Sequence, residues 1–127
     1  MSQSIALAGL IGRKDWSDIV WQAFRPGVQI HWLYRTGENG PAAALLRYEA
    51  GASVPLHEHP GWEHIFVLSG AQSDGVTRHA EGALMLSAPG TRHAINSDEG
   101  CVVLAIWNRP VRIIDDSNPD DGPRSPQ

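Results

Sequence analysis

The sequence predicts an all-β protein made of a single domain, and three observations support this prediction. Its 127 residues match the commonest size of one domain, ~100–150 residues. The 13 glycines and 9 prolines divide the chain into short segments rich in Val, Ile, Leu, Trp and Tyr. Turn signals recur every ~10–20 residues, which is typical of a β-sandwich or a β-barrel.

Taken in order, the segments with strand character are residues 28–35, 42–50, 63–70, 82–90, 100–108 and 111–114. Residues 13–24 fit either a short helix capped by Asp15 or Ser17, or an extended arm that packs its tryptophans on the body. We expect an N-terminal arm over 1–27, a barrel over 28–114 and a disordered acidic tail over 115–127. The tail contains no apolar residue except proline.

The segment "WEHIFVLS" is apolar on both faces of the expected strand. Ile65 and Val67 share one face, whereas Phe66 and Leu68 share the other. An antiparallel strand with one face in water alternates more cleanly. We therefore expect another sheet, the N-terminal arm or a second subunit to cover the second face, and we favour a homodimer.

Composition and charge exclude several classes of partner. The chain is 42% hydrophobic and 19% charged with a net charge of -4, so it lacks the basic surface of a nucleic-acid-binding protein. No apolar run approaches the ~20 residues that span a bilayer, and the N-terminus lacks the basic start of a signal peptide. Cys101 is the only cysteine. We expect a cytoplasmic protein with a small-molecule ligand or substrate and neither a nucleic-acid nor a membrane partner.

Four titratable side chains have the spacing of a metal site. His57 and His59 lie two residues apart, so both point to the same face of a strand. Glu63 follows the turn "PGW", and His93 follows a similar Pro-Gly turn. Three imidazoles and one carboxylate suit one divalent transition metal such as Fe, Zn, Mn or Ni. An octahedral ion would keep two open positions, as in catalytic or sensing sites.

The spacing of these residues resembles the first motif of the cupin superfamily, G-x5-H-x-H-x3-E-x6-G. Gly51, His57, His59, Glu63 and Gly70 occupy its fixed positions. The resemblance implies a single-domain RmlC-like jelly-roll β-barrel with a metal near one mouth.

The second cupin motif, G-x5-P-x-G-x2-H-x3-N, is matched by "GALMLSAPGTRHAINS" with small offsets. Gly82, Gly90 and His93 are in register, whereas Pro89 is one place late and Asn96 is one place early. We expect a small local change at the proline and no coordination by the asparagine. The resemblance implies that His93 is the fourth ligand.

Within the superfamily, "HEHPGWEHIFVLSG", "APGTRH" and the "GC" before "VVLAIW" resemble the ChrR-like cupins. Two classes of function then stay open. One is a metal-dependent enzyme, either a dioxygenase or an isomerase or lyase, acting on a small organic molecule. The other is a non-catalytic, ChrR-like sensor or regulatory protein. A barrel that binds a sugar or another small ligand around a structural metal is a third option. No catalytic base is evident, so catalytic residues beyond the ligands are unknown.

Other residues have plainer expected roles. The 5 tryptophans are expected in the core, with Trp107 a candidate for the lining of a pocket. His64 is expected at the surface or an interface, and Glu58 at a rim. Cys101 is expected to be a buried, unreactive thiol. A single arginine turned inwards would select an anionic ligand. The expected solvated arginines are Arg35, Arg47, Arg78 and Arg92.

Overall fold

The computed structural model describes residues 4–114, and these residues form ten β-strands and no helix. The predicted tail over 115–127 lies outside the described residues, and the division of the chain at residues 27 and 114 stays a prediction. The strands are β1 (Gln22–Arg25), β2 (Val28–Arg35), β3 (Ala42–Tyr48), β4 (Ala52–Glu58), β5 (Glu63–Ser73), β6 (Arg78–Ala80), β7 (Leu84–Ser87), β8 (Arg92–Ser97), β9 (Cys101–Trp107) and β10 (Arg112–Ile113).

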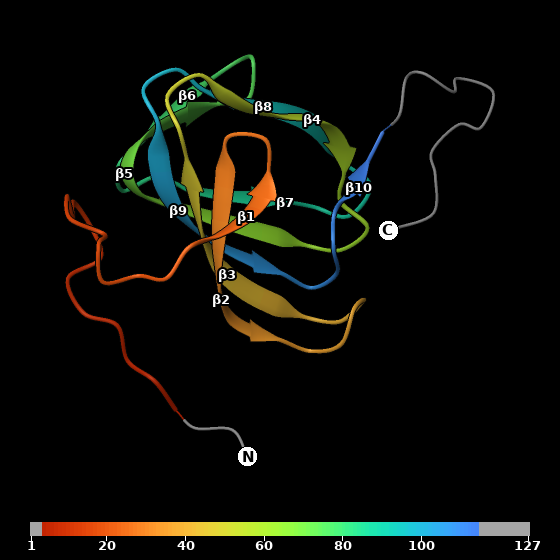
Figure 1. The fold of residues 1–127 in the computed structure, drawn as a ribbon. Coiled ribbons are helices and arrows are strands. Elements are labelled where there is room, and N and C mark those ends of the chain that lie inside the picture. Colours follow the sequence, from red (N-terminus) through yellow and green to blue (C-terminus); the bar gives the residue numbers. More distant parts are fainter. Residues whose placement is uncertain (1–3, 115–127) are drawn as a thin grey trace.

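The strands form one curled antiparallel sheet in the order β1-β2-β3-β9-β5-β8-β4-β10, with β6 and β7 also paired to β5 (Figure 1). The long strand β5 belongs to both halves of the sheet. Its first part pairs with β7 and β9, and its end pairs with β6 and β8. The prediction of an all-β fold is confirmed. Among residues 4–114 no helix is present that could cross a membrane.

Gly70 marks the place where β5 passes between the two halves. Its φ is +73°, and a Cβ built on it would lie 2.1 Å from the carbonyl oxygen of Gly100. Only glycine tolerates both the left-handed backbone and this close approach. The last glycine of the first motif is therefore required by the path of the chain.

The main core lies inside the curl. It contains Val28, Ile30, Leu46, Val67 and Val103, among others, and each of these is at most 5% exposed. These residues alternate along their strands with residues of the outer face, as a closed sheet requires.

A second core lies on the outer face of the sheet, under the N-terminal segment. Trp16 packs there with Leu45, Leu68 and Val102, and all four are buried. The segment is extended with turns and contains no helix. Of the two alternatives for residues 13–24, the extended arm is the one observed. The arm also covers the second apolar face of β5, which explains why that strand lacks a polar face.

Most predicted strands agree with the observed ones, and the exceptions have physical causes. The segment 82–90 shortens to β7, because the turn that carries Gly90 (φ +87°) begins earlier. The prediction that every tryptophan packs in the core is wrong for Trp62, which is 44% exposed in the turn before β5.

Candidate metal centre

A β-bulge in β4 turns His57 into the interior. Val54 pairs with Ile95 and His57 pairs with His93, so Pro55 and Leu56 together oppose a single residue of β8. A bulge of one extra residue reverses the side on which the following residues point. Val54 and His57 are therefore both buried, although they lie three apart. Pro55 suits this position because a bulge does not need its missing N–H.

The turn between β7 and β8 holds His59. The backbone N–H of His59 donates to the Thr91 carbonyl at 3.0 Å, and the Gly90 N–H donates to the His59 carbonyl at 2.8 Å. The ring Nδ1 of His59 also lies 2.9 Å from the Thr91 carbonyl oxygen and 3.1 Å from its hydroxyl. The imidazole is thus positioned by the same turn that leads into His93.

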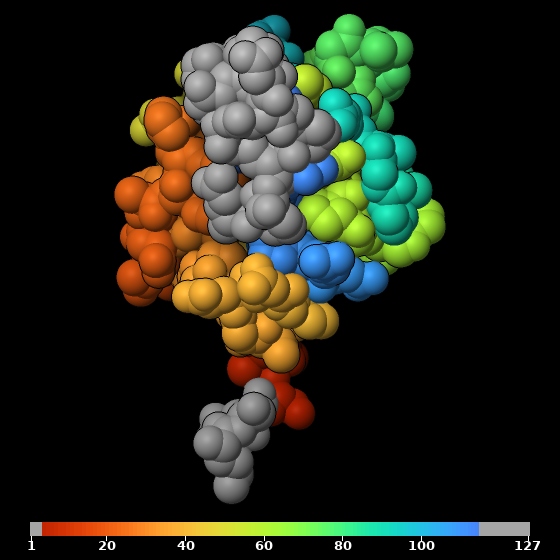
Figure 2. Space-filling view, turned by 90° about the vertical axis from the view of Figure 1, so that its right-hand side faces the viewer, coloured from red at the N-terminus to blue at the C-terminus, as the bar shows by residue number. Residues whose placement is uncertain are grey.

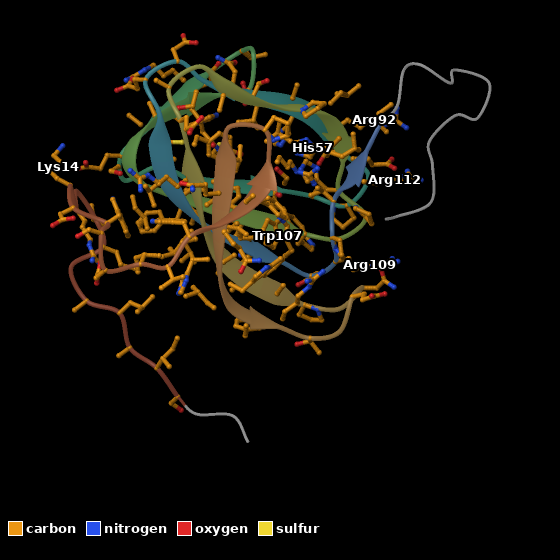
Figure 3. All side chains as sticks on the ribbon, viewed as in Figure 1. Lys14, His57, Arg92, Trp107, Arg109 and Arg112 are labelled. Atoms are coloured by element: carbon orange, nitrogen blue, oxygen red, sulfur yellow. The ribbon has the colours of Figure 1, made fainter. Side chains whose placement is uncertain are left out.

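The structure brings all four sequence-predicted residues together. One ligand atom from each of His57, His59, Glu63 and His93 lies within 4.8 Å of the other three. The ring centroids of the histidines are 4.6 to 5.0 Å apart. His57 belongs to β4, pairs with Ile113 of β10 and lies inside the curled sheet (Figure 3).

The two nitrogen atoms of these imidazole rings, Nδ1 and Nε2, have different roles. Nδ1 of His57 donates to the Pro55 carbonyl at 2.9 Å, and Nδ1 of His59 donates to Thr91. These bonds assign the proton to Nδ1 and leave Nε2 with a free lone pair. Among the described residues, Nε2 of His59 and Nε2 of His93 are buried and have no hydrogen-bond partner. Buried polar atoms without partners are costly, so this arrangement fits a bound metal ion.

The carboxylate of Glu63 completes the set. Its Oε1 lies 3.2 Å from Nε2 of His59 and 3.9 Å from Nε2 of His93. Burial by itself would raise the pKa of Glu63, but contacts with His59, His57 and Trp107 outweigh burial and lower the pKa. The carboxylate is therefore ionised at neutral pH.

His57 and His93 are correspondingly neutral. Burial lowers the pKa of His57. Burial, with the repulsion that His57 and His59 would exert when protonated, lowers the pKa of His93 to about 4. Neutral imidazoles and an ionised carboxylate are the protonation states that bind a metal.

Trp107 acts on the site from β9. It is the cross-strand partner of Glu63, and its Nε1–H donates to Oε2 of Glu63 at 2.6 Å. This bond holds one carboxylate oxygen and leaves Oε1 directed at the histidines. Trp107 also lines the cavity beside the site, as the sequence suggested.

A cavity of about 160 Å³ is lined by three of the four residues, His57, Glu63 and His93. Its wall is largely apolar and includes Val28, Leu46, Ile65 and Ile95. It also contains polar groups that the sequence did not indicate: Arg25, Tyr48, Gln72 and Ser87. Segments 36–41 and 107–111 contribute to its rim, and they lie next to each other on the face shown in Figure 2.

The remaining predicted residues lie outside the cluster. Glu58 ends β4, and its carboxylate pairs with Arg92 and Arg112, which are labelled on the right of Figure 3. The Asn96 side chain donates to Asp98 and does not reach the cluster. Cys101 is buried, as expected. The expected solvated arginines are exposed: Arg35, Arg47, Arg78 and Arg92.

Residues 13–111 match the model of the ChrR cupin-like domain. The chain belongs to this cupin family, and its curled antiparallel sheet is the RmlC-like cupin fold. No curated protein matches the sequence.

Solved structures agree with this assignment. An RmlC-like cupin from Ralstonia eutropha matches with a TM-score of 0.70 and 22% identity, over 84% of this chain and 74% of that chain. An acetylacetone dioxygenase from Acinetobacter johnsonii matches with a TM-score of 0.72 and 17% identity, over 92% and 87%.

A third similar structure is the Rhodobacter sphaeroides complex of SigE with the anti-sigma ChrR. The matched chain of that complex is 30% identical to this chain with a TM-score of 0.65, and the match covers 77% of this chain. The chain spans about half of that relative, 54% of its length.

Proposed function

We propose that the protein is a metal-dependent enzyme that acts on a small organic molecule, with one divalent transition metal held by His57, His59, Glu63 and His93. The observation that carries the proposal is the convergence of unpartnered imidazole nitrogens on one point in the wall of an apolar cavity. A metal site that adjoins a cavity leaves room for a further molecule, which closed structural sites do not.

The set of donor atoms restricts which metal ions can bind and which reactions they can support. Three imidazoles and one carboxylate, without thiolate, suit Fe, Zn, Mn or Ni. Such an ion, when bound, supplies Lewis-acid or redox chemistry to a molecule in the cavity. The residues of the chain do the rest: Trp107 orients Glu63, Thr91 orients His59, and the apolar wall excludes water. A dioxygenase-like reaction is our first choice, and isomerase or lyase chemistry is the second.

Elemental analysis of purified protein tests the proposal, followed by oxygen uptake with small diketones and catechols. Iron in the purified protein, together with oxygen uptake on addition of these compounds, would support a dioxygenase-like reaction. The variant His59→Ala should lose both metal and turnover. The matched control is His64→Ala, because His64 lies next to Glu63 on β5 and outside the ligand cluster. Loss of metal in the control, or no metal in the wild type, contradicts the proposal.

A non-catalytic regulatory role is the second candidate, and membership of the ChrR cupin-like family favours it. The 30% identity to a chain of the SigE–ChrR complex supports the same role. Tightly bound zinc without turnover of the compounds above would support this role over the first. We also propose that the protein is cytoplasmic and forms a homodimer. Light scattering on a size-exclusion column tests the homodimer.

A further inference from the structure

The hairpin β1–β2 brings an arginine to the cavity beside the metal centre. Ala23 pairs with Gln29 and Arg25 pairs with Val28, so Phe24 is an extra residue in β1. This bulge directs Arg25 to the face of its partner Val28, which is 2% exposed and lies in the inner core. Arg25 accordingly lines the same cavity as His57, Glu63 and His93. Figure 1 shows β1 in orange beside β2.

Arg25 has no carboxylate partner in the part of the chain that the structure describes. The described ion pairs of arginines join Arg13 to Asp18, Arg78 to Glu99, and Arg92 and Arg112 to Glu58. The contact of its guanidinium that the structure shows is with the ring of Phe24, at 4.9 Å. Burial lowers the pKa of Arg25, which reflects a charge partly removed from water. A charged group in this position is stabilised by an anion.

Tyr48 supplies a second donor in the same cavity. Its side chain belongs to β3, is 7% exposed and lines the cavity with Arg25. Among residues 4–114 its hydroxyl makes no hydrogen bond. Burial raises the pKa of Tyr48, so the hydroxyl keeps its proton. A protonated phenol next to a guanidinium provides hydrogen-bond donors and no negative charge.

We infer that Arg25 and the Tyr48 hydroxyl bind the anionic group of the molecule in this cavity, so that the site takes a small organic carboxylate. A guanidinium binds a carboxylate through two parallel hydrogen bonds. The cavity volume of about 160 Å³ is close to the ~150 Å³ that encloses benzene in an apolar cavity. The preferred molecule therefore has an apolar body of about one ring. This inference rests on the proposed function, because it names the substrate class of the same site.

Benzoate and its neutral analogue benzamide test the inference directly. Binding is followed by calorimetry and by the fluorescence of Trp32 and Trp107, which line the cavity. Each compound is titrated into metal-loaded and chelator-treated protein, which separates the contribution of the arginine from that of the metal. Wild-type protein should bind benzoate at least ~10-fold more tightly than benzamide in both forms, since hydrogen bonds to charged groups are the stronger ones.

Single-residue variants test which side chains cause the preference for benzoate over benzamide. Arg25→Gln should lose ~10-fold or more of the benzoate affinity and affect benzamide binding much less, whereas Arg25→Lys keeps part of the preference. Tyr48→Phe should lose a smaller factor. A matched control should retain wild-type binding. Arg47→Gln alters an exposed arginine that lies over Trp21 and is not part of the cavity lining.

The outcomes separate this inference from the proposed function. Wild-type protein that binds no benzoate, or that binds benzamide equally well, overturns the inference. So does a folded Arg25→Gln variant, checked by circular dichroism, that keeps its benzoate affinity. Metal content is measured on the same samples. Protein that takes up no metal under any loading condition, yet shows the Arg25-dependent preference, contradicts the metal-dependent function and supports the anion site.

Discussion

Trp107 and Glu63 are cross-strand partners in β9 and β5, and a buried hydrogen bond of 2.6 Å joins the indole N–H to the carboxylate. The pair connects the inner core to the metal centre, because Trp107 also lies 6.1 Å from Trp32, ring to ring. A carboxylate ligand held in this way keeps its free oxygen directed at the histidines.

Replacement of Trp107 by Phe therefore tests the importance of this bond. The variant keeps an aromatic ring but removes the donor, so we expect metal affinity to fall by ~10–100-fold. Metal-competition titration with a chromophoric chelator measures the change. Trp62→Phe, at a site that is 44% exposed, is the control and should bind metal like the wild type. Unchanged affinity in Trp107→Phe would show that Glu63 needs no positioning.

Replacement of His59 by Ala tests the ligand set itself. Loss of a direct ligand should weaken metal binding by more than the ~10–100-fold typical of an outer partner. The circular dichroism spectrum should stay that of a β-sheet protein, because the two cores do not include His59. Full metal occupancy of the purified variant, measured by elemental analysis, would contradict the assignment.

Trp16 is predicted to hold the N-terminal arm on the sheet. It is 5% exposed, and its Nε1–H donates to the Arg13 carbonyl at 3.1 Å. Trp16→Ala should lower the free energy of unfolding by about 3–5 kcal/mol, as measured by denaturation with guanidinium. Trp62→Ala should cost about 0.5 kcal/mol or less. Because the outer core lies on the opposite face of the sheet from the cavity, folded Trp16→Ala should still bind metal. A loss of metal would show that the arm shapes the inner face.

Cys101 offers a test of burial that depends on pH. Burial raises the pKa of its thiol to about 11. At pH 8 only about one thiol in a thousand is then ionised, and the thiolate is the reactive form. Ellman's reagent should react very slowly with folded protein, faster as the pH approaches 11, and at once after unfolding in guanidinium. Rapid reaction at pH 8 in native buffer would place Cys101 at the surface.

The sequence predicted the structure best where the spacing of neighbouring residues alone determines the local backbone geometry. The residues of the first motif specify a turn between two strands, and that turn brings Glu63 next to His59 over a short stretch of chain. The glycines of the motifs adopt positive φ values, for example +86° at Gly51 and +89° at Gly82. Their conformational requirement is local, so it can be read from the sequence.

Two bulges could not be predicted from alternation of apolar and polar residues. In β4 the bulge at Pro55–Leu56 explains why Leu56 is exposed while His57 is buried. A proline inside a strand was the signal available for it. In β1 the extra residue Phe24 turns Arg25 inwards. From the sequence, Arg25 was expected only to belong to the N-terminal arm. The Pro-Gly pair that follows it is a turn signal, and it was the available indication of the hairpin.

By itself the sequence determined the class of fold and the four candidate ligands. Only the tertiary structure decided that three of the four candidate ligands line an apolar cavity, that Trp107 holds Glu63, and that Arg25 reaches the same cavity. The physical reason is that ligand spacing and turns are properties of neighbouring residues. The contents of a cavity depend instead on register between strands distant in the chain, and a single bulge reverses which side chains face inwards.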